Sequence, residues 1–298
     1  MKKYNNVKWL LLFVLFTVAG TACSTRGDPG IEQSKNLLEK GKLIIVGGAM
    51  RDTTIFNTFL RFAGGNDAPI VVIPTAMADT ITNEMLQRTK ERMFMLGATN
   101  VTVLHTKDRK EANSPEFFDP VMRANGVWFT GGRQWRIADS YLGTLTQQAF
   151  DNVLRKGGVI GGSSAGATIQ GSYLARGDTK TNVIMMGDHE EGFGFLPGVA
   201  IDQHLLRRNR QFDLIEIIEA KPDLLGLGID ENTALVVQGD EFEVIGNGYV
   251  AVYDAGLWNT NTSPISGKFF LLSAGDKYNW KSRKVTFWGG NNRNIFGN

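Results

Sequence analysis

Ser164 lies between two glycines in the segment 161–167, whose sequence is GGSSAGA. The segment follows a short apolar run and precedes a helical pattern, and its Gly-x-Ser-x-Gly spacing is typical of a nucleophile elbow. Such a strained turn exposes the serine hydroxyl, and the Ala165 backbone N–H at the helix start would stabilise an oxyanion. Ser163 is the competing nucleophile. A glycine-rich turn that binds phosphate, or nothing, is the alternative interpretation.

A nucleophilic serine needs a base, and the chain has three histidines: His105, His189 and His204. His204 follows the apolar run 199–202, which would place it at the carboxyl end of a strand, where open α/β sheets build their sites. His105 ends an earlier predicted strand, and His189 lies in a glycine-rich segment typical of a solvated turn. The pattern favours His204 as the base, the alternative being a structural histidine in a cap or in the core.

Two acidic residues, Asp230 and Glu231, follow the apolar run 225–229 and are candidates to orient the imidazole. In α/β-hydrolases the order is serine, acid, then a late histidine. No histidine follows His204 here, so an acid placed after the histidine is expected. Neighbouring side chains on a strand point to opposite faces, and so only one of the two carboxylates should reach His204.

The elements that would position these residues alternate between short apolar runs and helical patterns. Continuous apolar runs are typical of parallel strands covered on both faces, and their alternation with helices predicts a doubly wound, mostly parallel α/β sheet. The predicted strands are 43–48, 70–74, 101–105, 127–132 and 158–162, and the predicted helices are 53–63, 82–96, 115–124, 135–156 and 165–173.

The last third of the chain is rich in predicted strands. A strand and helix at 199–202 and 204–220 precede strands at 225–229, 234–238, 242–245 and 249–253, with Gly239-Asp240 as a hairpin turn. The tail 259–298 is rich in Asn, Thr, Ser and Gly, and the patterns assign it no place. No linker or repeat divides the chain, which predicts one domain over 41–298.

The N-terminus has the composition of an export signal. Three lysines precede the apolar run 9–19, and small residues then lead to Cys23, the single cysteine of the chain. This arrangement predicts a signal peptide over 1–22, lipidation of Cys23 as in bacterial lipoproteins, and a polar tether over 23–40. The expected location is the cell envelope, with a lipid anchor in the membrane.

Composition excludes several functional classes. Lys and Arg number 32 against 30 Asp and Glu, a balance too even for a nucleic-acid-binding protein. A single cysteine excludes a disulfide framework and a multi-cysteine zinc site. A hydrophobic share of 42% is sufficient for a large core and excludes disorder.

The segments GGSSAGA (161–167), LPGVAIDQHLLRRNR (196–210), GIDENTALVV (228–237) and VWFTGGRQ (127–134) together resemble the cyanophycinase and aspartyl dipeptidase family of serine peptidases. The resemblance implies a class I glutamine amidotransferase-like, flavodoxin-type sheet with a strand-rich C-terminal part. It also implies a Ser-His-Glu triad made of Ser164, His204 and Glu231. The oxyanion donors it implies are the amides of Gly132 and Ala165.

The same resemblance implies substrate-binding roles for a set of polar residues: Gln134, Asp202, Gln203, Arg208 and Arg210. Arg133 and Asp213 depart from the family pattern, which argues against the cyanophycin polymer as substrate. No metal or other cofactor is expected. A homodimer is compatible with the sequence.

The expected function is therefore hydrolysis of Asp-containing peptides or β-aspartyl isopeptides through an acyl-enzyme. An envelope esterase with the same serine elbow, and a lipid-anchored binding protein without turnover, are the alternatives. The presence of all three triad residue types argues against the latter.

Overall fold

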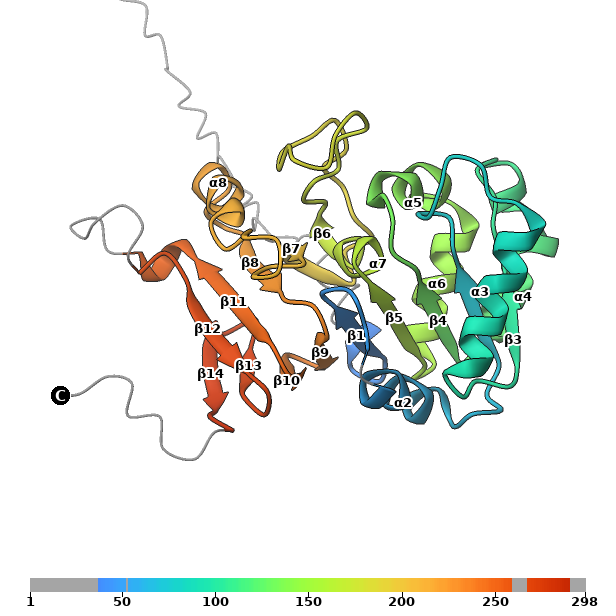
Figure 1. The fold of residues 1–298 in the computed structure, drawn as a ribbon, viewed down its shortest axis with the longest axis horizontal. Coiled ribbons are helices and arrows are strands. Elements are labelled where there is room, and N and C mark those ends of the chain that lie inside the picture. The colour runs from blue at the N-terminus through green and yellow to red at the C-terminus, as the bar shows by residue number, and fades with distance from the viewer. Residues whose placement is uncertain (1–36, 52, 259–266, 290–298) are drawn as a thin grey trace, which may run out of the picture.

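The computed structural model describes residues 37–51, 53–258 and 267–289 (Figure 1). The predicted signal peptide 1–22, Cys23 and most of the predicted tether 23–40 lie outside these residues. Leu37 and Leu38 are buried in the hydrophobic core, and the Leu38 carbonyl accepts a hydrogen bond from the Gly239 amide at 2.9 Å. The packed part of the chain therefore includes these two leucines, because their apolar side chains fill the core rather than a polar tether.

The parallel part of the first sheet is made of short strands whose side chains are almost entirely buried, except in the edge strand β3, where Thr102 is exposed. Its strands are β1 (Lys42–Val46), β2 (Ile70–Ile73), β3 (Val101–Val103), β4 (Gly126–Phe129) and β5 (Val159–Ser163). They lie in the order β3-β2-β4-β5-β1. This is the flavodoxin order 2-1-3-4-5 with the first strand of the chain in the last place. The predicted doubly wound α/β fold is confirmed.

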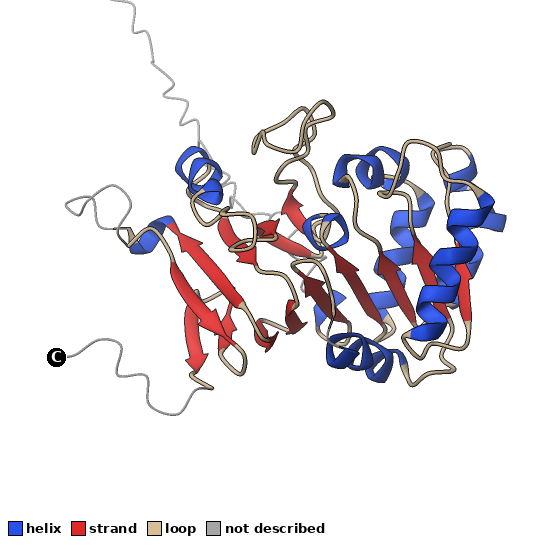
Figure 2. Cartoon of the chain, viewed as in Figure 1, coloured by secondary structure: helices blue, strands red, loops and turns tan. Residues whose placement is uncertain are grey.

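Helices cover both faces of this sheet (Figure 2). On one face α2 and α3 pack against Trp128 and the β1 side chains Ile44 and Val46. On the other face α4 and α6 contribute Phe117 and Phe150 to the larger core cluster. The helices are α2 (Thr53–Ala63), α3 (Asn83–Met95), α4 (Pro115–Arg123), α5 (Gln134–Tyr141) and α6 (Leu145–Arg155), with a 3₁₀ turn η1 at Glu111–Asn113.

Antiparallel strands extend the first sheet beyond β1. The added strands are β9 (Thr233–Gln238), β10 (Glu241–Gly246), β13 (Lys277–Asn279) and β14 (Lys284–Phe287). The hairpin between β9 and β10 turns at Gly239-Asp240 as predicted. The described part of the tail therefore has a defined place, because β13 pairs with β10 and buries Tyr278 against Phe242.

The second sheet, in the order β12-β11-β8-β7-β6, shares the larger core cluster with the first. Figure 1 shows it beside β1 and β5, with α8 over it. Leu227 and Val252 lie in the shared cluster, whereas Ile217 of α8 packs on the opposite face with Tyr253. Its elements are β6 (Gly171–Tyr173), β7 (Leu196–Gln203), β8 (Leu225–Ile229), β11 (Tyr249–Asp254), β12 (Phe270–Ser273), α8 (Asp213–Ala220) and the 3₁₀ turn η2 (Ala255–Leu257).

Three predicted helices differ from the structure. The helix expected over 135–156 is two helices, because the Thr144 hydroxyl caps a new one by accepting from the Gln147 amide at 3.3 Å. The helix expected over 165–173 ends at Thr168, after which the chain forms β6. The helix expected over 204–220 begins at Asp213, because the residues after His204 form turns. Among the described helices, none has the length and apolarity to cross a membrane.

Candidate active site

Ser164 occupies the turn between β5 and α7 (Ala165–Thr168), with φ 57° and ψ −112°. A non-glycine residue at positive φ is strained, and strain of this kind is typical of functional turns. The turn is tight: a Cβ added to Gly162 would lie 2.2 Å from the Gly166 carbonyl oxygen. Only glycine fits there. Steric restriction therefore explains why the predicted elbow contains its two glycines.

Ser163 and Ser164 face different sides of the sheet. Side chains alternate along a strand, and Val159 belongs to the core cluster under α2 and α3, where Gly161 also packs against Trp128. Ser163 therefore points to the α2/α3 face and lines a cavity there. Ser164 is the serine that points to the histidine.

His204 follows β7, and its Nε2 lies 2.9 Å from the Ser164 Oγ. Its backbone N–H donates to the Gly47 carbonyl at 2.8 Å, which fixes it over the end of β1. The imidazole packs directly on Gly48, where a Cβ would lie 2.3 Å from Cε1. Burial lowers the His204 pKa below its usual value and outweighs the hydrogen bond to Glu231, which raises it. The lowered pKa favours the neutral, basic form of the imidazole.

Glu231 completes a continuous chain of hydrogen-bonding groups, since its Oε1 lies 2.8 Å from the His204 Nδ1. Asp230 and Glu231 come after the last residue of β8, and Asn232 donates its N–H to the Gly48 carbonyl at 2.9 Å. The other candidate acid, Asp230, does not contact the imidazole: its Oδ1 accepts from the Arg207 amide at 3.1 Å and so supports the turn that follows His204.

Two backbone N–H groups near Ser164 are unpaired in the part of the chain that the structure describes. Within the described residues, neither the Gly132 nor the Ala165 N–H has a hydrogen-bond acceptor. Ala165 opens α7, and Gly131, next to Gly132, is so close to Ser164 that an added Cβ would lie 3.3 Å from the serine Cβ. Free N–H groups at such a position are the donors that an oxyanion requires.

The polar residues expected to bind substrate separate into buried and exposed ones. Gln134 is fully buried, and its Nε2 donates to the carbonyls of Ala175 and Arg176 at 2.6 and 2.9 Å. Gln203 is also buried, and its Oε1 accepts from Arg210 Nη1 at 2.7 Å. These side chains therefore hold the walls of the site in the structure.

Arg208 is exposed, and its side chain has no hydrogen bond or ion pair with the described residues. It lies near enough to His204 for its charge to lower the histidine pKa. Of the expected substrate-binding residues, Arg208 is the one whose charged group is available to a ligand. Arg210, by contrast, is 8% exposed and lies between Gln203 and Asp202.

Sequence reasoning missed Arg176. Its guanidinium donates to both carboxylate oxygens of Asp202, at 2.8 and 2.9 Å, and also to Asp213. Asp202 is fully buried and so is neutralised by this fork rather than open to substrate. Asp213, the departure from the family pattern, is the second acid on the same arginine. No local sequence pattern indicates this ion pair, because Arg176 lies in a loop 26 residues before Asp202.

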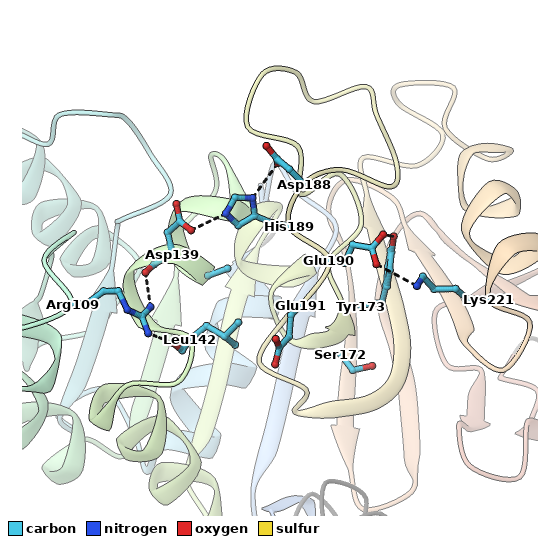
Figure 3. A pocket seen from close by; sticks show the side chains of 11 residues that line it. Arg109, Asp139, Leu142, Ser172, Tyr173, Asp188, His189, Glu190, Glu191 and Lys221 are labelled. Carbon is cyan, nitrogen blue, oxygen red and sulfur yellow. Dashed lines mark hydrogen bonds and ion pairs between the residues drawn. The ribbon is translucent and has the colours of Figure 1, made fainter.

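The other two histidines lie elsewhere. His105 Nδ1 contacts the Thr75 hydroxyl at 3.0 Å. His189 lies between Asp139 at 2.7 Å and Asp188 at 3.1 Å, on the rim of a cavity of about 710 Å³ (Figure 3). This cavity is larger than those near Ser164, but none of the three residues Ser164, His204 and Glu231 lines it. His189 therefore ties its loop to α5 and takes no part in the serine site.

The described residues contain no group of three or more His, Cys, Asp or Glu side chains arranged to hold a metal ion. The site around Ser164 consists of a serine hydroxyl, an imidazole, a carboxylate and free backbone amides. Chemically, this set can activate the hydroxyl for attack on a carbonyl carbon and hold the resulting oxyanion.

Comparison with known proteins identifies the family of the chain. The family model described as "Peptidase family S51" matches residues 43–245, more than half of the chain. The chain belongs to peptidase family S51. Cyanophycinase from Geminocystis herdmanii (strain PCC 6308) is 30% identical over 265 residues, which cover 82% of this chain and 96% of that protein. Cyanophycinase from Synechococcus elongatus is 33% identical over 264 residues, covering 83% and 81% of the two chains.

A solved structure supports the fold of this S51 peptidase. The crystal structure of a peptidase from an acI-B1 Actinobacterium matches with a TM-score of 0.62 and 23% identity, covering 80% of this chain and 96% of that one. The chain is thus a hydrolase of the peptidase class with similarity to cyanophycinases, which confirms the family expected from the motifs.

Proposed function

We propose that this S51 peptidase hydrolyses the bond after an aspartyl residue, in α- or β-linkage, with Ser164 as nucleophile, His204 as general base and Glu231 as the orienting acid. The observation that carries the proposal is the pair of contacts at His204: 2.9 Å from Nε2 to the Ser164 Oγ and 2.8 Å from Nδ1 to the Glu231 Oε1. Both distances lie within the range required for proton transfer and for tautomer control.

The reaction follows from these positions. The Ser164 Oγ attacks the scissile carbonyl carbon while His204 Nε2 takes the hydroxyl proton, and the amides of Gly132 and Ala165 stabilise the oxyanion. Collapse breaks the C–N bond, and the imidazolium returns the proton to the leaving amine. A water molecule, deprotonated by the same imidazole, then hydrolyses the acyl-enzyme and releases the aspartyl product.

Recognition of the aspartyl part is assigned to Arg208. A guanidinium binds a carboxylate through two parallel hydrogen bonds, and the Arg208 guanidinium is exposed and has no partner among the described residues. Arg210, Gln203 and Asp202 are proposed to hold the pocket wall behind it, since all three are buried and bonded to one another or to Arg176.

The test is a panel of α- and β-aspartyl dipeptides offered beside cyanophycin and a simple carboxylic ester. We expect turnover of at least one aspartyl series and none by Ser164→Ala. Ester hydrolysis without any peptide hydrolysis would contradict the proposal and favour an esterase. Absence of all turnover, together with failure of a serine-directed phosphonate to react, would favour a binding protein.

The proposed location is the bacterial cell envelope, with Cys23 carrying the lipid anchor. Its support is the sequence alone: a basic start, an apolar run and small residues before the single cysteine. A thioether-linked diacylglycerol requires the cysteine sulfur, and so Cys23→Ser should move the protein out of the membrane fraction. Unchanged partition into detergent would contradict lipidation.

A further inference from the structure

A cavity of about 240 Å³ opens next to Ser164 on the α2/α3 face of the sheet. Gly131 and Ser163 form the part of its wall closest to the nucleophile. Ser163 is the neighbour of Ser164 in the chain, and a Cβ on Gly131 would lie 3.3 Å from the Ser164 Cβ. Gly131 therefore connects the two places: it has no side chain, it lies against Ser164, and it lines the cavity.

The cavity lies where the sheet reverses its winding. From β2 the chain passes through α3 outward to β3, and from β4 it passes through α5 and α6 the other way to β5, whereas β2 and β4 are neighbours. Met77 follows β2 and Thr130 follows β4, and both line the cavity. Open α/β sheets bind ligands in the crevice at this switch point, outside the carboxyl ends of the strands.

The walls combine large apolar side chains with the hydroxyls of Thr89, Thr130 and Ser163. Met50, Met77, Met93 and Trp128 line the cavity. Methionine side chains are flexible and adapt to apolar groups of different shape. The volume is below the roughly 300–1,000 Å³ of pockets for drug-sized ligands, and so it suits one amino-acid side chain rather than a longer peptide.

One cation lies among the lining residues. Arg92 of α3 is exposed and forms no ion pair or hydrogen bond through its side chain with the described residues, whereas Arg88, one turn earlier, pairs with Glu84 at 2.6 Å. An unpaired guanidinium beside an apolar cavity attracts a carboxylate and disfavours a second cation. An arginine side chain is therefore a poor occupant of this cavity.

The aspartyl side of the substrate is assigned to other elements. Asp202, Gln203 and Arg208 come from β7 and the turn after it, and none of them lines the cavity. This leaves the cavity to the residue on the far side of the scissile bond.

We infer that the residue released by cleavage is an apolar amino acid, whose side chain fills the cavity lined by Met50, Met77 and Trp128 and whose free carboxylate binds Arg92. The inference rests on the proposed aspartyl peptidase function and specifies its substrates as Asp-X dipeptides in which X is leucine, methionine or a residue of similar size and polarity.

The first measurement is kcat/KM for Asp-Leu, Asp-Met and Asp-Arg, each in α- and β-linkage. Burial of a leucine or methionine side chain is favourable enough to give a preference of tenfold or more over arginine. Equal or higher kcat/KM for Asp-Arg would overturn the inference and leave the proposed function standing.

The second measurement uses a substitution in the wall of the cavity. Met77→Glu places a carboxylate at a position that is 41% exposed, so the fold should tolerate it. It should lower kcat/KM for Asp-Leu and raise it for Asp-Arg, moving their ratio by about tenfold or more. The matched control is Met95→Glu, at a position that is 80% exposed and outside the cavity. A ratio that does not differ between the two variants would overturn the inference.

The third measurement concerns Arg92. Arg92→Gln should raise KM for a dipeptide with a free carboxylate and leave KM for the corresponding dipeptide amide unchanged, whereas Arg88→Gln should change neither. If no aspartyl peptide is cleaved, the proposed function fails, and the cavity is tested by ligand protection. Leucine, but not arginine, should then slow phosphonate labelling of Ser164, and equal effects of the two amino acids would overturn the inference.

Discussion

Arg176 and Asp202, which lies two residues before His204 in the chain, form a buried two-bond ion pair, with Nε and Nη2 of the arginine 2.8 and 2.9 Å from the two Asp202 carboxylate oxygens. Their side chains are 3% and 0% exposed. The pair therefore fixes β7, which ends at Gln203 immediately before His204, to the loop that contains Arg176. Its removal should affect folding as well as activity.

Arg176→Met should lower the free energy of unfolding by about 3–5 kcal/mol, because it leaves the Asp202 carboxylate buried without its main partner. Arg176→Met combined with Asp202→Asn should recover a large part of this loss. Arg88→Ala is the control, since the Arg88–Glu84 pair is exposed and should change stability by less than about 1 kcal/mol. Urea unfolding measures all three, and a single Arg176→Met variant as stable as wild type would contradict the assignment.

The roles of the adjacent acids are expected to differ. Glu231→Gln should reduce kcat strongly, by up to about 10⁴-fold, because an amide no longer stabilises the imidazolium. Asp230→Asn keeps an oxygen that can accept from the Arg207 amide, and so kcat should stay within tenfold of wild type. Steady-state kinetics of both variants on one substrate measure the two changes in kcat. A larger loss for Asp230→Asn would show that the wrong carboxylate has been paired with His204.

The pH profile should have its acid limb below pH 6.5. Burial lowers the His204 pKa from the usual 6.5, and the nearby charge of Arg208 lowers it further. Activity needs the neutral imidazole, and therefore kcat/KM should rise as pH increases through this lowered pKa and stay high above it.

Arg208→Gln removes a nearby positive charge and should move the acid limb to higher pH. Arg207→Gln is the matched control, because Arg207 is an exposed neighbour in the same turn and its charge does not contribute to the His204 shift. Profiles of kcat/KM for the three proteins test the prediction. A limb that moves to lower pH in Arg208→Gln would contradict it.

Asp151 of α6 offers a test of electrostatics away from the site. Burial raises its pKa to about 6, against the opposing effect of Arg155. A carboxyl whose pKa is raised by folding stabilises the folded state below its unfolded pKa, and this contribution is lost as pH rises through about 6. Asp151→Asn should therefore raise Tm at pH 8 relative to wild type by a few degrees, and lose this advantage at pH 4. Thermal unfolding at the two pH values measures it, and no gain at pH 8 would contradict the shift.

Local sequence patterns were sufficient for the parallel sheet and for the elbow. The strand over 70–74 was predictable because an uninterrupted apolar run needs cover on both faces, and β2 spans Ile70–Ile73. The elbow was found because its Gly-x-Ser-x-Gly spacing is local, and the contact that requires glycine at 162 is also local: an added Cβ would lie 2.2 Å from the Gly166 carbonyl oxygen.

Features that depend on distant partners were not predictable. β13 is held by pairing with β10 and by burial of Tyr278, and nothing in Lys277–Asn279 itself indicates a strand. The structural role of Arg176 depends on its ion pairs with Asp202 and Asp213, which lie 26 and 37 residues away in the chain. The role of Asp230 depended likewise on where the turn containing Arg207 would lie.

The central claim is that Ser164, rather than Ser163, is the nucleophile, and it can be tested without knowing the substrate. The purified protein is treated with a serine-directed fluorophosphonate, and the modified residue is located by fragment-ion mass spectrometry. Because Ser164 Oγ lies 2.9 Å from His204 Nε2 while no contact joins the Ser163 hydroxyl to a histidine among the described residues, the adduct should lie on Ser164 and should be lost in Ser164→Ala but retained in Ser163→Ala. An adduct on Ser163, or labelling that persists in Ser164→Ala, would contradict the account.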